Sequence, residues 1–165
     1  MTHSRARCLM IAAGLRGLRA EGIPATKAPR HEEPLMSYVP VSQREEAVAK
    51  QIVNAAYTVH KQLGPGLLEK VYEICFCHEL KKLGLSFQRQ IDIPIIYDSL
   101  VFDEALRLDV LVEDLVICEL EAVEQVNPVW EAQLLSHLKL TGKRLAFLIN
   151  FNVPLIKSGI RRFVV

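Results

Sequence analysis

The chain has 165 residues, enough for one domain of ordinary size, of which 50% are apolar and 24% are charged. This composition excludes a chain that is disordered throughout, and no apolar run reaches the roughly 20 residues that a membrane-spanning helix needs. The formal net charge of +1 excludes the basic field of a general DNA-coating protein, so any nucleic-acid site would have to be local.

Residues 1–40 differ in composition from the rest of the chain. They carry six basic and three acidic residues, a net charge of +3, and four of the eight prolines, without a sustained apolar period. We expect a flexible basic leader that is disordered and dispensable for folding. An arginine-rich start is also typical of an organelle transit peptide, and Met36 competes with Met1 as the translation start.

Two helices are predicted directly after the leader. The first begins with the capping-box pair Ser42 and Glu45 and continues at helical spacing until the Gly64-Pro65-Gly66 break. The second follows at once and ends at Gly84. Residues 41–165 are therefore expected to form the folded domain.

The hydrophobic period changes to two after the second helix, which predicts strands. We expect strands over residues 87–97, 106–112 and 115–120, with Pro94 at an edge position or a bulge and a turn at Glu113-Asp114. A helix over 127–141 and a nearly all-apolar strand over 144–151 follow. The order α-α-β-β-β-α-β predicts an α/β (α+β) fold, with a mixed central β-sheet flanked by helices.

The chain has four cysteines, two of which are only one residue apart: Cys8, Cys75, Cys77 and Cys118. This number and spacing do not form the disulfide framework of a small secreted domain. A reducing interior suits these thiols better, and we expect the protein to be cytoplasmic.

The predicted hairpin gathers carboxylates on one face. A turn at residues 113–114 places Asp109 opposite Glu119, and Glu121 shares the face of Glu119 because side chains two apart on a strand point the same way. Like charges at this spacing repel, and a hard cation such as Mg²⁺ or Mn²⁺ would relieve the repulsion. The pattern equally fits the solvated face of a sheet with Arg89 or Arg107 as partners.

The segment from Gly66 to Tyr72, GLLEKVY, resembles the signature of the GxxExxY protein family, a group within the PD-(D/E)XK nuclease-like superfamily. The resemblance runs from about Glu46 to Val164. It includes RLDVLVED at 107–114, ELEAVE at 119–124, EAQLL at 131–135, KLTGK at 139–143 and LINF at 148–151. Several motifs in the same order make the resemblance specific, and it implies a restriction-endonuclease-like core.

The resemblance also implies a metal site. The superfamily uses an acidic residue on the first core helix, an aspartate on the second strand and an (Asp/Glu)-x-Lys on the third. Carried over residue by residue, these positions are Glu69, Asp109, Glu119 and Glu121, with Mg²⁺ or Mn²⁺ as the implied cofactor. A glutamate, Glu121, therefore stands where the family has its lysine.

A further element is implied on the helix after the third strand. The superfamily often carries a Gln-x-x-x-Tyr pattern there that faces the site. The corresponding residues here are Gln133 and His137, so a histidine replaces the tyrosine. We treat both as candidate site residues.

Two functions of different classes follow from these residues. The first is a metal-dependent nuclease that hydrolyses phosphodiester bonds of DNA or RNA, in which Glu121 could bind a second metal or act as a general base. The second is a catalytically degenerate nuclease-fold module that binds nucleic acid or a protein partner. The sequence indicates neither DNA nor RNA, no sequence preference and no oligomeric state.

Basic residues near the end of the chain bear on the nucleic-acid partner. They are Lys139, Lys143, Arg144, Lys157, Arg161 and Arg162. Such a group predicts either a basic rim for phosphates or the solvated end of a helix and tail.

Overall fold

The computed structural model describes residues 40–165, apart from the side chains of residues 103–105. The leader predicted over residues 1–40 and the candidate starts Met1 and Met36 thus fall outside the described residues, with Pro40 as the exception. The predicted domain, residues 41–165, coincides with the described part of the chain, and its boundary stays a prediction.

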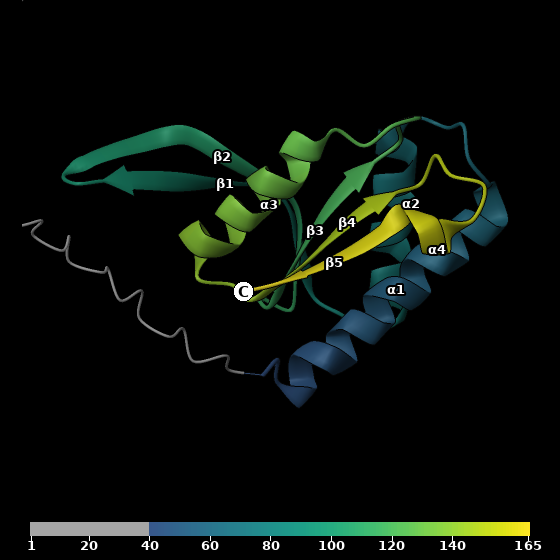
Figure 1. Cartoon of the computed structure of the whole chain (residues 1–165). Coiled ribbons are helices and arrows are strands. Elements are labelled where there is room, and N and C mark those ends of the chain that lie inside the picture. Colours follow the sequence, from purple (N-terminus) through teal and green to yellow (C-terminus); the bar gives the residue numbers. More distant parts are fainter. Residues whose placement is uncertain (1–39) are drawn as a thin grey trace, which may run out of the picture. The chain divides into compact units, whose positions relative to one another are not determined.

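A five-stranded mixed sheet forms the centre of the domain, with the strands in the order β1-β2-β3-β4-β5 (Figure 1). The strands are β1 (Phe87–Tyr97), β2 (Leu100–Val112), β3 (Val116–Glu121), β4 (Leu145–Asn150) and β5 (Ile160–Val164). β3 and β4 are parallel, and the other neighbouring pairs are antiparallel. The prediction of a mixed sheet flanked by helices in a restriction-endonuclease-like fold is confirmed.

Helices cover both faces of the sheet (Figure 1). They are α1 (Gln43–Leu63), α2 (Glu69–Lys82), α3 (Pro128–Thr141) and the short α4 (Ile156–Gly159). The predicted capping box is present, since the Glu45 amide donates to the Ser42 hydroxyl and the Glu45 carboxylate accepts from the Ser42 amide. Among the described residues, no helix is long and apolar enough to cross a membrane.

Two hydrophobic cores hold these layers together. Ile52 of α1 and Phe76 of α2 are fully buried against one face of the sheet, together with Cys118 of β3. On the opposite face, Leu134 of α3 packs with Ile117 of β3 in a second core. Each large apolar side chain buried in this way contributes about 1.5–3 kcal/mol to stability. β3 and β4 are covered on both faces. A charged residue on either strand is therefore unusual, because burying an unpaired charge is costly.

The chain after β4 differs from the prediction. The predicted order is confirmed through β4, and the structure then adds α4 and β5 at the end of the chain. The strand predicted over 106–112 is the inner part of a longer β2 that begins at Leu100. Pro94 lies on the edge strand β1, at a register shift between Ile93 and Ile95, so the prediction of an edge position or a bulge is confirmed.

Candidate functional site

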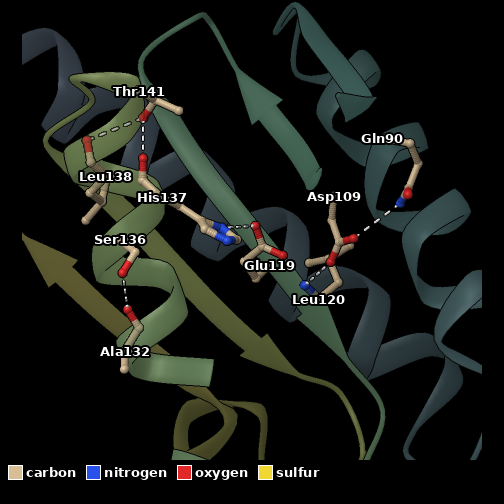
Figure 2. Close-up of polar contacts among 9 residues, drawn as sticks. All are labelled: Gln90, Asp109, Glu119, Leu120, Ala132, Ser136, His137, Leu138 and Thr141. Atoms are coloured by element: carbon tan, nitrogen blue, oxygen red, sulfur yellow. Dashed lines mark hydrogen bonds and ion pairs between the residues drawn. The ribbon is translucent and has the colours of Figure 1, made fainter. Parts of the chain in front are cut away.

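The sheet opens at Asp109, where β2 separates from β3. The β2–β3 ladder ends at the pair Val110 and Cys118, whereas the β3–β4 ladder continues to Glu121. Beyond the end of the ladder, the Leu120 amide donates to Asp109 Oδ2 at 2.9 Å (Figure 2). The Asp109 carboxylate thus takes the place of a strand partner. It lies against β3 at the point where β2 and β3 separate, which we call the fork.

Gln90 of β1 holds the Asp109 carboxylate from the other side. Its Nε2 donates to Asp109 Oδ1 at 3.3 Å (Figure 2), and its φ is +51°, in the left-handed region that non-glycine residues rarely adopt. Such a conformation costs on the order of 1–3 kcal/mol and is retained where surrounding structure enforces it. No pattern in the sequence points to this residue, because a glutamine in a strand is ordinary.

At Gln90 and Asp109, the antiparallel ribbon formed by β1 and β2 also changes which of its faces points to each core. Phe87 and Val110 pack in the core under α1 and α2, whereas Ile91 and Leu108 pack in the core under α3. Residues two or four apart on a regular strand share a face, so the alternation breaks on both strands at Gln90 and Asp109. The period of two along residues 106–112 is therefore interrupted at Asp109, where the chain changes face.

His137 of α3 reaches the first carboxylate of β3. Its Nδ1 lies 3.2 Å from Oε1 of Glu119, and both side chains are nearly buried (Figure 2). Burial raises the pKa of Glu119 to about 7, with Asp109 contributing in the same direction and the His137 contact opposing it. The structure thus brings together Asp109, Glu119 and His137, and their common role in a site stays a prediction.

Glu69 and Glu121 complete a group of four carboxylates that we call the acidic centre: Glu69, Asp109, Glu119 and Glu121. Glu121 is the last residue of β3, and Glu69 is the first residue of α2. Burial and repulsion from the other three carboxylates raise the pKa of Glu121 to about 7. The pKa of Glu69 is raised as well, first by burial and then by Asp109. The four predicted carboxylates are therefore close enough to repel one another.

A neutralised carboxylate lies beside the acidic centre. Glu73 of α2 is buried and binds Arg89 of β1, with Oε1 at 2.7 Å from Nε and 2.6 Å from Nη2. Lys70 contacts the second oxygen of Glu73 at 3.1 Å. Sequence reasoning missed Glu73, although its place four residues after Glu69 on the same helix face was a usable signal.

Gln133 lies near His137 on a cavity wall. A surface cavity of about 340 Å³ is lined by Gln133, Ser136 and His137 of α3 and by Ile95 and Leu106 of the β1–β2 ribbon. Gln133 is exposed there, one helical turn before His137. Its predicted role at the site stays a prediction.

The acidic centre offers the ligand atoms that a hard cation prefers, but its side chains are not arranged around a common metal position. Among the described residues, no group of three or more His, Cys, Asp or Glu side chains is placed to hold a metal ion. The centre nevertheless offers carboxylate oxygens, the donors that Mg²⁺ and Mn²⁺ prefer, and their mutual repulsion is what a cation relieves. Ligation by all four side chains requires them to turn toward a common point.

The predicted basic rim is largely engaged within the protein. Lys143 pairs with Asp114, Arg161 with Glu131 and Arg162 with Glu46. These ion pairs favour the interpretation of a solvated helix end and tail over that of a phosphate rim.

One comparison with known proteins places most of the described chain in a family. A family model described as the PD-(D/E)XK nuclease superfamily matches residues 46–163. No curated protein and no solved structure gives a significant match to the chain. The matched range contains all four carboxylates of the acidic centre together with Gln133 and His137, whereas the narrower GxxExxY assignment stays a prediction.

Proposed function

Because the chain belongs to the PD-(D/E)XK nuclease superfamily, we propose that it is a metal-dependent nuclease that hydrolyses phosphodiester bonds of DNA or RNA. The observation that carries the proposal is the acidic centre at the fork of β2 and β3. Four carboxylates lie together there, and desolvation together with mutual repulsion raises the pKa of three of them. Such an arrangement is unfavourable for folding alone and is suited to a divalent cation.

Asp109 and Glu119 are the proposed principal ligands of Mg²⁺ or Mn²⁺, with Glu69 as a further ligand. When bound, the cation would polarise a phosphodiester oxygen and lower the pKa of a water molecule. Gln90 and the Leu120 amide orient Asp109.

The remaining polar groups of the site act around these ligands. His137 orients the Glu119 carboxylate through its Nδ1 contact, in the manner of the outer groups that commonly fix metal ligands. Glu121 offers no positive charge, so it does not offset the charge that develops on phosphorus as the lysine would; the alternative is that Glu121 acts as a further ligand or a general base.

A metal titration followed by thermal melting tests the binding step. Mn²⁺ at about 100 times its dissociation constant is expected to stabilise the full chain by about 2.7 kcal/mol through mass action. Asp109→Asn removes a principal ligand and should abolish this response. Asp92→Asn is the matched control, because Asp92 lies on β1 in an exposed ion pair with Arg107. An equal response in Asp109→Asn and wild type would remove Asp109 from the site.

A cleavage assay tests the chemical step. Wild type is expected to cleave plasmid DNA, single-stranded DNA or RNA in the presence of Mg²⁺ or Mn²⁺, and Asp109→Asn is expected to be inactive. If wild type binds metal and cleaves none of these substrates, the nuclease proposal fails. The alternative is then favoured, a degenerate module that binds nucleic acid or a protein partner, and Glu121 in place of lysine is the residue that supports it.

A further inference from the structure

The tyrosine of the GLLEKVY segment, Tyr72, forms hydrogen bonds to the loop of residues 64–68, which precedes Glu69 of the acidic centre. Tyr72 is fully buried, yet its hydroxyl donates to the Gly64 carbonyl at 2.7 Å and accepts from the Leu67 amide at 3.1 Å. A buried hydroxyl is costly unless it is hydrogen-bonded, and here both partners belong to the loop between α1 and α2. The next turn of the chain begins α2 at Glu69.

Residues 65–68 of this loop are exposed. Leu68, the N-cap residue of α2, is 77% exposed and provides no side-chain capping hydrogen bond. Gly66 has a φ of +98°, a conformation that a residue with a side chain rarely adopts. The Tyr72 hydroxyl therefore has a large share in setting where α2 begins and where Glu69 lies.

The Tyr72 ring continues the connection toward β3. It stacks on the Phe151 ring with a centroid distance of 4.7 Å and an interplanar angle of 5°, and both rings are fully buried. The Phe151 amide in turn donates to the carbonyl of Glu121 at 2.8 Å. A continuous series of contacts thus joins the loop before Glu69 to the backbone of Glu121.

We propose that Tyr72 is a positioning residue that fixes Glu69 relative to Glu121 across the acidic centre. The inference rests on the proposed function in one respect, namely that the acidic centre binds a divalent cation. Residues behind metal ligands commonly change metal affinity by about 10–100-fold when they are altered, because they set the orientation of the ligands. A purely structural core residue changes the free energy of unfolding and leaves the metal affinity of the folded protein unchanged.

Tyr72→Phe tests the proposal in the full chain, because it removes the hydroxyl and retains the stacked ring. The dissociation constant of Mn²⁺, measured from the EPR signal of the free ion, is expected to rise about 10-fold. Tyr57→Phe is the matched control, since Tyr57 is an exposed tyrosine on α1, and it should leave the affinity unchanged. A Tyr72→Phe protein that melts at a lower temperature but binds Mn²⁺ as tightly as wild type would overturn the proposal.

A thermodynamic cycle identifies the residue through which Tyr72 acts. If Tyr72 acts through Glu69, Tyr72→Phe has no further effect on Mn²⁺ affinity once Glu69→Gln is present. Additive losses in the double variant would show that Tyr72 does not act through Glu69, and would contradict the inference. Cleavage measured in parallel should show a higher metal requirement and an unchanged rate at saturating Mn²⁺.

Hydrogen exchange separates failure of this inference from failure of the proposed function. Both the Leu67 amide and the Phe151 amide are expected to exchange faster in Tyr72→Phe: Leu67 loses its acceptor, and the ring that stacks on Phe151 loses the hydrogen bonds that hold it in place. Faster exchange at Leu67 alone would overturn the inference whether or not the protein binds metal. If wild type binds no Mn²⁺, the proposed function falls and the exchange result still decides whether Tyr72 links the two segments.

Discussion

Glu69 and Glu73 lie about one turn apart on α2, and their surroundings shift the pKa of the two carboxyls in opposite directions. Burial raises the pKa of each carboxyl. At Glu73 the hydrogen bonds and charges of Arg89 and Lys70 outweigh burial, so the pKa of Glu73 is lowered. At Glu69 the carboxylate of Asp109 adds to burial, and the pKa is raised. The fold thus neutralises one carboxylate and leaves its neighbour among like charges.

This difference separates a carboxylate that is neutralised within the fold from the acidic centre, which we propose binds a cation. Arg89 closes the ion pair with Glu73 next to Gln90, so the neutralised region supports the backbone that holds Asp109. In the acidic centre, His137 is the one basic side chain among the groups that shift the pKa of Glu119, and the shift of Glu121 has acidic neighbours as its electrostatic causes. Under the proposed function, a divalent cation supplies the positive charge that these described neighbours of Glu119 and Glu121 lack.

The largest expected effect comes from placing a cation inside the acidic centre. Glu121→Lys introduces at β3 the kind of neutralisation that Arg89 gives Glu73, and it restores the residue that the superfamily pattern has there. A well-placed electrostatic donor is worth about 10²–10³ in rate, so metal-dependent cleavage should rise by that order. Cleavage of a labelled substrate under single-turnover conditions measures it.

The matched control for this change is Glu121→Gln, which removes the negative charge without adding a positive one. It is expected to leave cleavage near the wild-type level. If both substitutions lower the rate, Glu121 is a working ligand or base, and the comparison with Glu73 no longer describes its role.

A smaller effect is expected when each region loses one charge. Glu73→Gln leaves the partly buried Arg89 without its carboxylate, and should lower the free energy of unfolding by about 1–2 kcal/mol. Glu121→Gln in the metal-free protein removes a repelling charge and should raise the free energy of unfolding by less than about 1 kcal/mol. Urea denaturation in the presence of EDTA measures both. Changes of the same sign in the two variants would break the distinction between the regions.

Local sequence patterns were sufficient for the positions of most elements. The capping box at Ser42, the bulge at Pro94 and the turn at residues 113–114 each depend on the chemistry of a few neighbouring residues. The turn then fixed the register of β2 and β3, and with it the approach of Asp109 to Glu119. The family resemblance placed Glu69 in the same group, which spacing alone did not.

Features that depend on distant pairs could not be predicted in this way. The change of face at Gln90 and Asp109 requires both strands to depart from regular geometry at the same point, and the sequence of neither strand indicates it. The Glu73–Arg89 ion pair joins a helix to a strand 16 residues later. α4 and β5 are short, and the charged pair Arg161-Arg162 hides the period of β5.

A pH dependence of opposite sign is expected in the two regions. The pKa values of Glu119 and Glu121 in the folded protein are about 7, above the ordinary 4.5, so between these values the folded state holds protons that the unfolded state releases. Stability of the metal-free protein should therefore fall as pH rises from about 5 to 7, by less than about 1.4 kcal/mol per pH unit for each proton. Glu73, with its lowered pKa, contributes stability above pH 4.5 and loses it only in more acidic solution. Urea denaturation at several pH values, repeated with the double variant Glu119→Gln, Glu121→Gln, isolates the two carboxyls from His137 and the other neighbours. A slope that persists unchanged in the double variant would place the titrating groups outside the acidic centre.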